Sequence, residues 1–204
     1  MEKPDRYHTL ARPSTPILYK VKNSRFYGYA YPLISENEVR PLLDSLKTKH
    51  PAANHYCYAW RLGVNSTSYR VNDDGEPKNT AGMPIYGQIQ SFKLTNVLVV
   101  VVRIFGGTKL GVGGLIGAYR NTAQMALMAS KVVEKTILVQ VVIKFGYADM
   151  DKVMRIIKQN KIKIVTQHFE MDCNVVVDIP KSQVTEIIGK FSALKNVAVL
   201  KKDN

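Results

Sequence analysis

The apolar run at residues 97–102 (VLVVVV) constrains the fold of this chain more than any other segment. Six consecutive apolar residues leave no polar face, which predicts a strand buried on both faces in the middle of a sheet. A glycine-rich loop follows, and then a helix is expected over about residues 113–130, where Tyr119, Ala123 and Leu127 lie on one apolar face. Apolar residues make up 46% of the chain, which indicates a globular protein with packed cores.

Alternating and helical patterns predict the elements that precede this strand. Strands are expected at residues 17–21, 25–33, 55–62 and 67–71, and helices at about residues 35–49 and 80–92. The first of these helices opens on Ser35-Glu36-Asn37-Glu38, which has the S-x-x-E form of a capping box.

The sequence pattern changes after about residue 135. Strands are expected at residues 137–145, 161–168, 171–179 and 197–200, with helices around residues 153–160 and 184–191. The order βαββαβ is that of a ferredoxin-like domain. We therefore expect an α+β protein with two domains, residues 1–135 and 136–204, and a boundary near residues 131–136.

The chain is strongly basic, which favours an anionic partner. Lys and Arg number 29 against 16 Asp and Glu, a net charge of +13. Residues 1–135 hold 18 of the basic and 9 of the acidic residues, so most of the excess lies in the first domain. Such a surface attracts polyanions, and nucleic acid is the leading partner class. The alternative is a basic surface that only maintains solubility.

The sequence indicates a cytoplasmic protein with no membrane partner. The charged start, Met1-Glu2-Lys3-Pro4-Asp5-Arg6, is not that of a secretory signal, and the apolar run at residues 97–102 is too short to span a bilayer. Cys57 and Cys173 lie in different halves of the chain without a C-x-x-C spacing, which fits a reducing compartment.

The glycine-rich loop is the main candidate for an anion-binding site. Glycines let the backbone approach a ligand closely, and the start of the next helix offers unpaired N–H groups and a positive dipole end. Lys109 adds a point charge. The predicted anion- or nucleic-acid-binding residues are Arg103, Gly106, Gly107, Lys109, Gly111, Gly113, Gly114 and Arg120. Alternatively, the glycines serve only tight turns and close packing of helix on strand.

Neither of two nucleotide-binding motifs fits this loop, so no cofactor is expected. The P-loop pattern G-x-x-x-x-G-K-[ST] is absent, because Lys109 is followed by Leu110. The Gly111-Val112-Gly113 fragment faintly resembles a dinucleotide fingerprint, but it lies several residues beyond the predicted strand.

A thiol and an imidazole fall on one face of the strand predicted at residues 55–62. His55 and Cys57 could in principle act as base and nucleophile, or bind a metal. The chain has only four His and two Cys, and nothing completes a zinc site. Because Tyr56, Tyr58 and Trp60 fill the opposite face, we expect a structural location rather than a cleft, and a buried, non-catalytic Cys57.

Acidic residues gather in the turn that follows the predicted strand at residues 67–71. Asp73, Asp74 and Glu76 could bind a hard cation or carry out acid and base chemistry. Within a turn, such residues more often cap the N–H groups at the start of a helix, and Asn79 or Thr80 also suits such a cap. No metal site is predicted.

Four segments in order resemble the signatures of the YigZ/IMPACT family. They are Lys22-Asn23-Ser24-Arg25-Phe26, His55-Tyr56-Cys57-Tyr58-Ala59, the D-G-E-P loop from Asp74 to Ile85, and the glycine-rich segment from Arg103 to Leu115. His55, Cys57, Asp74, Glu76 and Thr80 are residues of these motifs. Ile104 departs from the family pattern, in which an aromatic residue is usual.

The resemblance implies the fold and narrows the function. It implies an N-terminal domain like domain two of ribosomal protein S-five, a fold shared with GHMP-class kinases, and a C-terminal domain like the last domain of elongation factor G. Eukaryotic members regulate translation initiation and carry an additional RWD domain, for which there is no room before Ile17, so we expect the bacterial two-domain form.

Three hypotheses about function remain open at this point. The leading one is a non-enzymatic protein that binds RNA, the ribosome or a translation factor. The second is an enzyme of GHMP-kinase-like fold that binds a phosphate or nucleotide at the glycine-rich loop. The third is a protein-interaction regulator without nucleic-acid contact. Fold alone does not choose between them.

Overall fold

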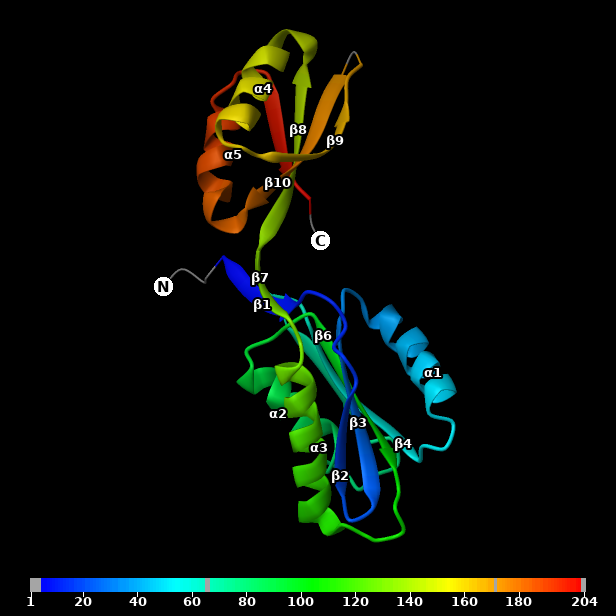
Figure 1. Ribbon diagram of the computed structural model, residues 1–204. Coiled ribbons are helices and arrows are strands. Elements are labelled where there is room, and N and C mark those ends of the chain that lie inside the picture. Colours follow the sequence, from blue (N-terminus) through cyan, green and yellow to red (C-terminus); the bar gives the residue numbers. More distant parts are fainter. Residues whose placement is uncertain (1–4, 65–66, 171, 203–204) are drawn as a thin grey trace. The chain divides into compact units, whose positions relative to one another are not determined.

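The computed structural model describes residues 5–64, 67–170 and 172–202 and divides into two compact units (Figure 1). The N-terminal unit is Tyr7–Lys135. The C-terminal unit is the chain from Thr136 onward, together with Asp5 and Arg6, which the sequence had assigned to the first domain. The expected α+β class is confirmed. None of the described helices is both long and apolar enough to cross a membrane.

A five-stranded antiparallel sheet with the order β2-β3-β6-β4-β5 forms the N-terminal unit. Its strands are β2 (Ile17–Val21), β3 (Ser24–Pro32), β4 (His55–Leu62), β5 (Ser68–Asn72) and β6 (Val97–Ile104). Its helices are α1 (Val39–Lys49), preceded by the short turn η1 (Glu36–Glu38), α2 (Gly82–Ser91) and α3 (Gly111–Met128). The helix α3 begins two residues before the predicted start, so Gly111, Gly113 and Gly114 lie in its first turn.

The apolar run of the sequence is the central strand of this sheet, as predicted. Val97, Val99 and Val101 face the core that contains α2 and α3, and the residues between them face the core that contains α1. The helices accordingly cover both faces of the sheet (Figure 1). All six residues of the run have no exposed surface, which explains why the strand carries no polar face.

Two short strands were not predicted. β1 (Arg6–Leu10) and β7 (Val132–Thr136) form a two-stranded sheet, and β7 occupies the segment where a domain boundary was expected. His8 also forms an isolated parallel bridge with Leu94. The pairing joins residues more than one hundred positions apart, so no local pattern marks it.

The C-terminal unit has the predicted ferredoxin-like order. Its elements are β8 (Leu138–Gly146), η2 (Tyr147–Asp149), α4 (Met150–Gln159), β9 (Lys163–His168), β10 (Asp172–Pro180), η3 (Lys181–Gln183), α5 (Val184–Ser192) and β11 (Val197–Lys201). The sheet order is β11-β8-β10-β9, and both helices lie on one face (Figure 1). Val153 and Ile157 of α4 and Ile187 and Phe191 of α5 fill its core. Met171, where the third strand was expected to start, lies outside the described residues.

Candidate functional site

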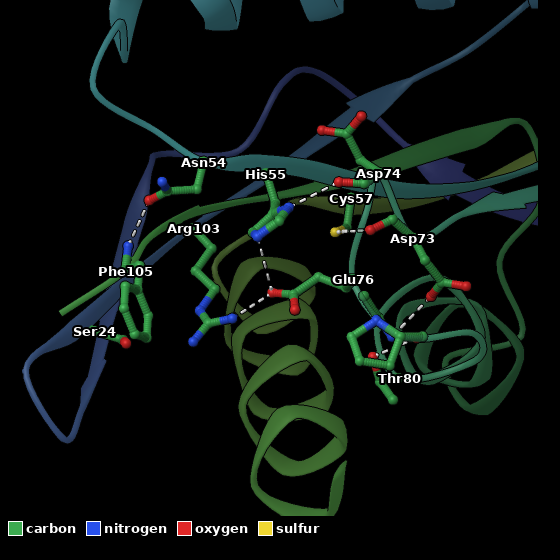
Figure 2. A network of polar contacts seen from close by, with 12 residues as sticks. Ser24, Asn54, His55, Cys57, Asp73, Asp74, Glu76, Thr80, Arg103 and Phe105 are labelled. Atoms are coloured by element: carbon green, nitrogen blue, oxygen red, sulfur yellow. Dashed lines mark hydrogen bonds and ion pairs between the residues drawn. The ribbon is translucent and has the colours of Figure 1, made fainter. Parts of the chain in front are cut away.

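Three segments that are distant in sequence meet where β4 begins and β6 ends (Figure 2). His55 on β4 pairs in register with Arg103 on β6. The loop after β5 supplies Glu76, and the loop between β6 and α3 supplies Phe105 and Lys109. These segments are three of the motifs identified in the sequence, and the antiparallel pairing of β4 with β6 brings them together.

A buried ion pair between Glu76 and Arg103 forms the base of this site (Figure 2). The Arg103 Nη1 lies 2.6 Å from the Glu76 Oε1, and the side chains are only 6% and 4% exposed. The Tyr119 hydroxyl, on α3, donates to the same oxygen at 2.8 Å. Arg103 was predicted to bind an external anion, but Glu76 already compensates its charge, so binding of a ligand by Arg103 stays a prediction.

His55 lies beside this ion pair, and its hydrogen bond shows which ring nitrogen carries a proton. Its Nδ1 is 2.8 Å from the carbonyl oxygen of Asp74, which can only accept, so Nδ1 carries the proton. Nε2 then faces the Glu76 Oε1 at 3.9 Å. The Asp74 side chain accepts from the Tyr56 N–H at 2.6 Å and holds the loop on β4. The expectation that His55 lies away from a cleft is wrong, because His55 lines a pocket.

Cys57, two residues after His55 on β4, is buried, and its thiol is hydrogen-bonded to the main chain. Its Sγ donates to the carbonyl oxygen of Asp73 at 2.9 Å and lies 3.3 Å from the Tyr119 hydroxyl. Burial raises the pKa of the Cys57 thiol; a hydrogen bond with Tyr119 opposes the shift and the charge of Glu76 adds to it. Burial likewise raises the pKa of Tyr119. Both groups therefore stay protonated, and the thiol is a poor nucleophile.

Asp73 caps the start of α2, although it precedes the helix by several residues in the sequence. Its carboxylate accepts from the N–H groups of Asn79, Ala81 and Gly82 at 2.8–3.0 Å. Thr80 was a predicted cap, but its hydroxyl donates to the Pro77 carbonyl at 2.6 Å instead. The helix-capping role expected of the acidic turn therefore applies to Asp73 alone, whereas Asp74 accepts from the Tyr56 N–H on β4 and Glu76 lies in the buried pair.

The glycines of the loop differ in what surrounds them. A Cβ on Gly106 would lie 2.1 Å from the Asn23 carbonyl carbon, and the Gly106 N–H donates to the Ser24 hydroxyl at 3.2 Å. Close packing therefore explains Gly106, and it gives Ser24 of the first motif a role. Gly107 has a φ of +85° and Gly111 a φ of +73°. A Cβ on Gly107, Gly111 or Gly113 would meet no atom within 4 Å, whereas one on Gly114 would meet the Leu110 Cβ at 3.0 Å.

A pocket of about 480 Å³, here called the Glu76 pocket, opens between these segments. Its polar lining is Asn54, His55, Glu76, Arg103 and Lys109, and its other lining residues are Pro77, Phe105, Leu110, Gly111, Val112 and Leu115. Lys109 is exposed. Arg120 is exposed farther along α3 and does not line this pocket. The volume is within the range of small-molecule sites.

Sequence reasoning missed the roles of two residues of the site. Tyr119 was placed on the apolar face of its helix, without its contact to Glu76. The Asn54 side chain accepts from the Phe105 N–H at 2.9 Å and the Asn54 N–H donates to the Arg103 carbonyl, so Asn54 anchors the loop. No short motif contains these contacts. In the described part of the chain, no group of three or more His, Cys, Asp or Glu could hold a metal.

Comparison with known proteins gives two matching family models. The model described as the Impact N-terminal domain matches residues 22–127, and a domain of unknown function (DUF1949) matches residues 143–194. The IMPACT family member YigZ of Escherichia coli is 29% identical over 184 residues, which cover 88% of this chain and 90% of that protein. An IMPACT family member of Haemophilus influenzae is 30% identical over 179 residues, or 84% of this chain and 85% of that protein. A crystal structure described as that of an hypothetical protein matches with a TM-score of 0.76 at 26% identity and covers 99% of this chain and 100% of that one.

Proposed function

The chain belongs to the IMPACT family, and we propose that it is a non-enzymatic, cytoplasmic protein that binds RNA or the ribosome and regulates translation. The family resemblance supports a role in translation. The N-terminal unit supports an anionic partner, because the exposed Lys109 lies beside the start of α3. That juxtaposition of a lysine with an open helix start is the observation that carries the proposal.

The start of α3 has the properties of a phosphate-binding helix terminus. The helix runs for 18 residues, its N-cap residue Leu110 supplies no side-chain cap, and its first turn contains no acidic residue. These N–H groups and the helix dipole attract anions. Because a Cβ on Gly111 or Gly113 would meet no atom within 4 Å, the main chain there is open to an approaching group.

The charge of the N-terminal half supports an extended polyanion rather than a single small anion. Residues 1–135 carry 18 basic and 9 acidic residues. The carboxylate that lines the pocket together with Lys109, that of Glu76, is paired with Arg103 and does not repel a phosphate at Lys109 as a free charge would. Binding of this kind is mainly electrostatic, and it weakens steeply with added salt because the release of counterions from the nucleic acid then gains less free energy.

One observation favours a second candidate, an enzyme that acts on a phosphorylated small molecule. The His55 Nε2 and Glu76 both line the Glu76 pocket, and such a pair can transfer protons when a substrate lies against it. The resemblance to GHMP-class kinases points in the same direction. Calorimetric titration with ATP and magnesium separates the candidates, because a kinase-like enzyme requires a site for a nucleoside triphosphate with magnesium, whereas RNA binding requires neither the triphosphate nor the metal.

The proposal is tested by measuring the affinity of the full chain for a labelled single-stranded RNA and for purified ribosomes over a range of salt concentrations. Replacing Lys109 with Ala is expected to reduce the salt slope by about one unit, because one phosphate contact is lost. Lys109→Glu should weaken binding further. Lys201→Ala is the control, since Lys201 is exposed in the other unit.

The proposal is wrong if the Lys109 variants fold normally and bind RNA and ribosomes as tightly as the parent at low and moderate salt. In that case packing alone would explain the glycines, and a protein-interaction regulator without nucleic-acid contact would become the leading hypothesis.

A further inference from the structure

We infer that the Glu76 pocket accepts one unstacked nucleotide of a single-stranded RNA, with its base against Phe105 and its phosphate at Lys109. The inference rests on the proposed function and narrows its ligand from RNA in general to an unpaired nucleotide. It uses the exposed apolar residues and the hydrogen-bond acceptors that line the pocket, which phosphate binding alone leaves unexplained.

The volume of the Glu76 pocket selects an unpaired nucleotide over a duplex. A pocket of about 480 Å³ lies in the range of sites for small molecules. A base within a duplex is stacked and paired and cannot enter such a space. Bases of loops and free ends can be splayed out and bound one at a time, which is the usual mode of sequence-dependent RNA recognition.

The apolar lining provides a surface for stacking. Phe105 is 41% exposed and Val112 is 60% exposed, although both are large apolar residues next to a pocket. The Arg103 guanidinium lies 5.3 Å from the centre of the Phe105 ring, and Asn54 accepts the Phe105 N–H. The ring is therefore held in position before any ligand binds. Stacking on an aromatic side chain is the main sequence-tolerant contact of single-stranded nucleic acids.

The charges of the pocket set the direction in which a nucleotide can lie. Lys109 and the N–H groups of α3 attract the phosphate, whereas the Glu76–Arg103 pair is compensated in charge and offers no comparable attraction. The side-chain hydrogen bonds and ion pairs of Glu76 with described residues all use Oε1, so Oε2 remains able to accept a hydrogen bond. In the neutral ring with its proton on Nδ1, the His55 Nε2 is a second acceptor nearby. Two acceptors match the amino or imino N–H groups on a base edge.

The inference is tested with the full chain and two labelled probes of equal length, a single-stranded RNA of about twelve nucleotides and the corresponding RNA duplex. Phe105→Ala should lower the affinity for the single strand by about fivefold or more, because the stacking surface is lost, and should leave the affinity for the duplex unchanged. Phe169→Ala is a matched control, since Phe169 is 40% exposed and lies outside the N-terminal unit. Phe105→Leu keeps the apolar volume and serves if the alanine variant unfolds.

The outcomes separate this inference from the proposed function. A parent that binds the duplex as tightly as the single strand, or a Phe105→Ala variant that binds the single strand like the parent, overturns the nucleotide pocket. If Lys109→Ala still weakens both probes in that case, RNA binding stands without it. A parent that binds neither probe at low salt overturns both. Shifts of the His55 ring signals in NMR spectra upon addition of the single strand, absent with Phe105→Ala, would support the pocket directly.

Discussion

The Glu76–Arg103 ion pair allows a quantitative prediction, because both side chains are buried and each is the charged partner of the other. Replacing Glu76 with Ala leaves the Arg103 guanidinium charged and only 6% exposed without a carboxylate. Removing one partner of a buried pair typically costs about 3–5 kcal/mol, and the Tyr119 hydroxyl also loses its acceptor. We expect Glu76→Ala to lower the free energy of unfolding of the N-terminal unit by about 4 kcal/mol.

Urea unfolding followed by tryptophan fluorescence measures this loss. Trp60 is the only tryptophan of the chain, is 4% exposed and lies in the N-terminal unit, so its emission reports on that unit. The exposed Glu36–Arg70 pair, whose atoms are 2.9 Å apart, is the control. Arg70→Ala should cost less than about 1 kcal/mol, because exposed ion pairs contribute little.

A second variant separates the loss of charge balance from the loss of packing. Changing Glu76 to Leu together with Arg103 to Met removes both charges and should recover most of the stability lost in Glu76→Ala. The reasoning is refuted if Glu76→Ala costs no more than Arg70→Ala, or if the double variant is less stable than Glu76→Ala.

Three further predictions follow from the structure. Iodoacetamide should label Cys57 slowly in the native chain and completely in urea; rapid stoichiometric labelling near neutral pH, read by mass spectrometry, would contradict its burial. Burial and the neighbouring Lys49 lower the pKa of His50, whose Nε2 is hydrogen-bonded to the Tyr29 hydroxyl at 2.6 Å. The stability contributed by the neutral ring is therefore present above its ordinary pKa and lost as the pH falls through the lowered value. The urea midpoint of the parent should therefore fall more steeply than that of His50→Gln as the pH is lowered below neutral, and equal slopes would disprove this. A fragment of residues 136–204 should unfold cooperatively on heating, since its sheet and two helices enclose one core, and a soluble fragment without a transition would argue for one interdependent protein.

The elements of this fold that follow from local patterns were predicted within a few residues. The central strand β6 was identified because burial on both faces requires an unbroken apolar run, and residues 97–102 provide one. The ferredoxin-like unit was identified because alternation and helical spacing succeed one another in a known order. The S-x-x-E motif forms only half of a capping box, since the Ser35 hydroxyl accepts from the Asn37 N–H at the start of η1, while Glu38 accepts from the Ile34 N–H and not from the Ser35 N–H.

Two features could not be predicted from the sequence, the β1–β7 sheet and the Glu76–Arg103 contact, because both depend on pairing between distant segments. β1 and β7 are short and mixed in composition, and each is a strand only because the other is present. Glu76 and Arg103 were assigned to separate motifs, one in an acidic turn and one beside a basic loop. Their contact requires the register in which His55 pairs with Arg103, and no spacing within a single motif encodes that register.

The central claim is that RNA is the partner of the N-terminal unit, and ultraviolet crosslinking in cells tests it most directly. The parent chain, Lys109→Glu and Lys202→Glu are each expressed, crosslinked and purified under denaturing conditions, and the RNA that remains attached is radiolabelled and quantified. The account predicts labelled RNA on the parent and on the control Lys202→Glu, and much less on Lys109→Glu, because a reversed charge beside the start of α3 repels the phosphate. Label on the parent no higher than in cells without crosslinking, or equal label on the parent and Lys109→Glu, would contradict it.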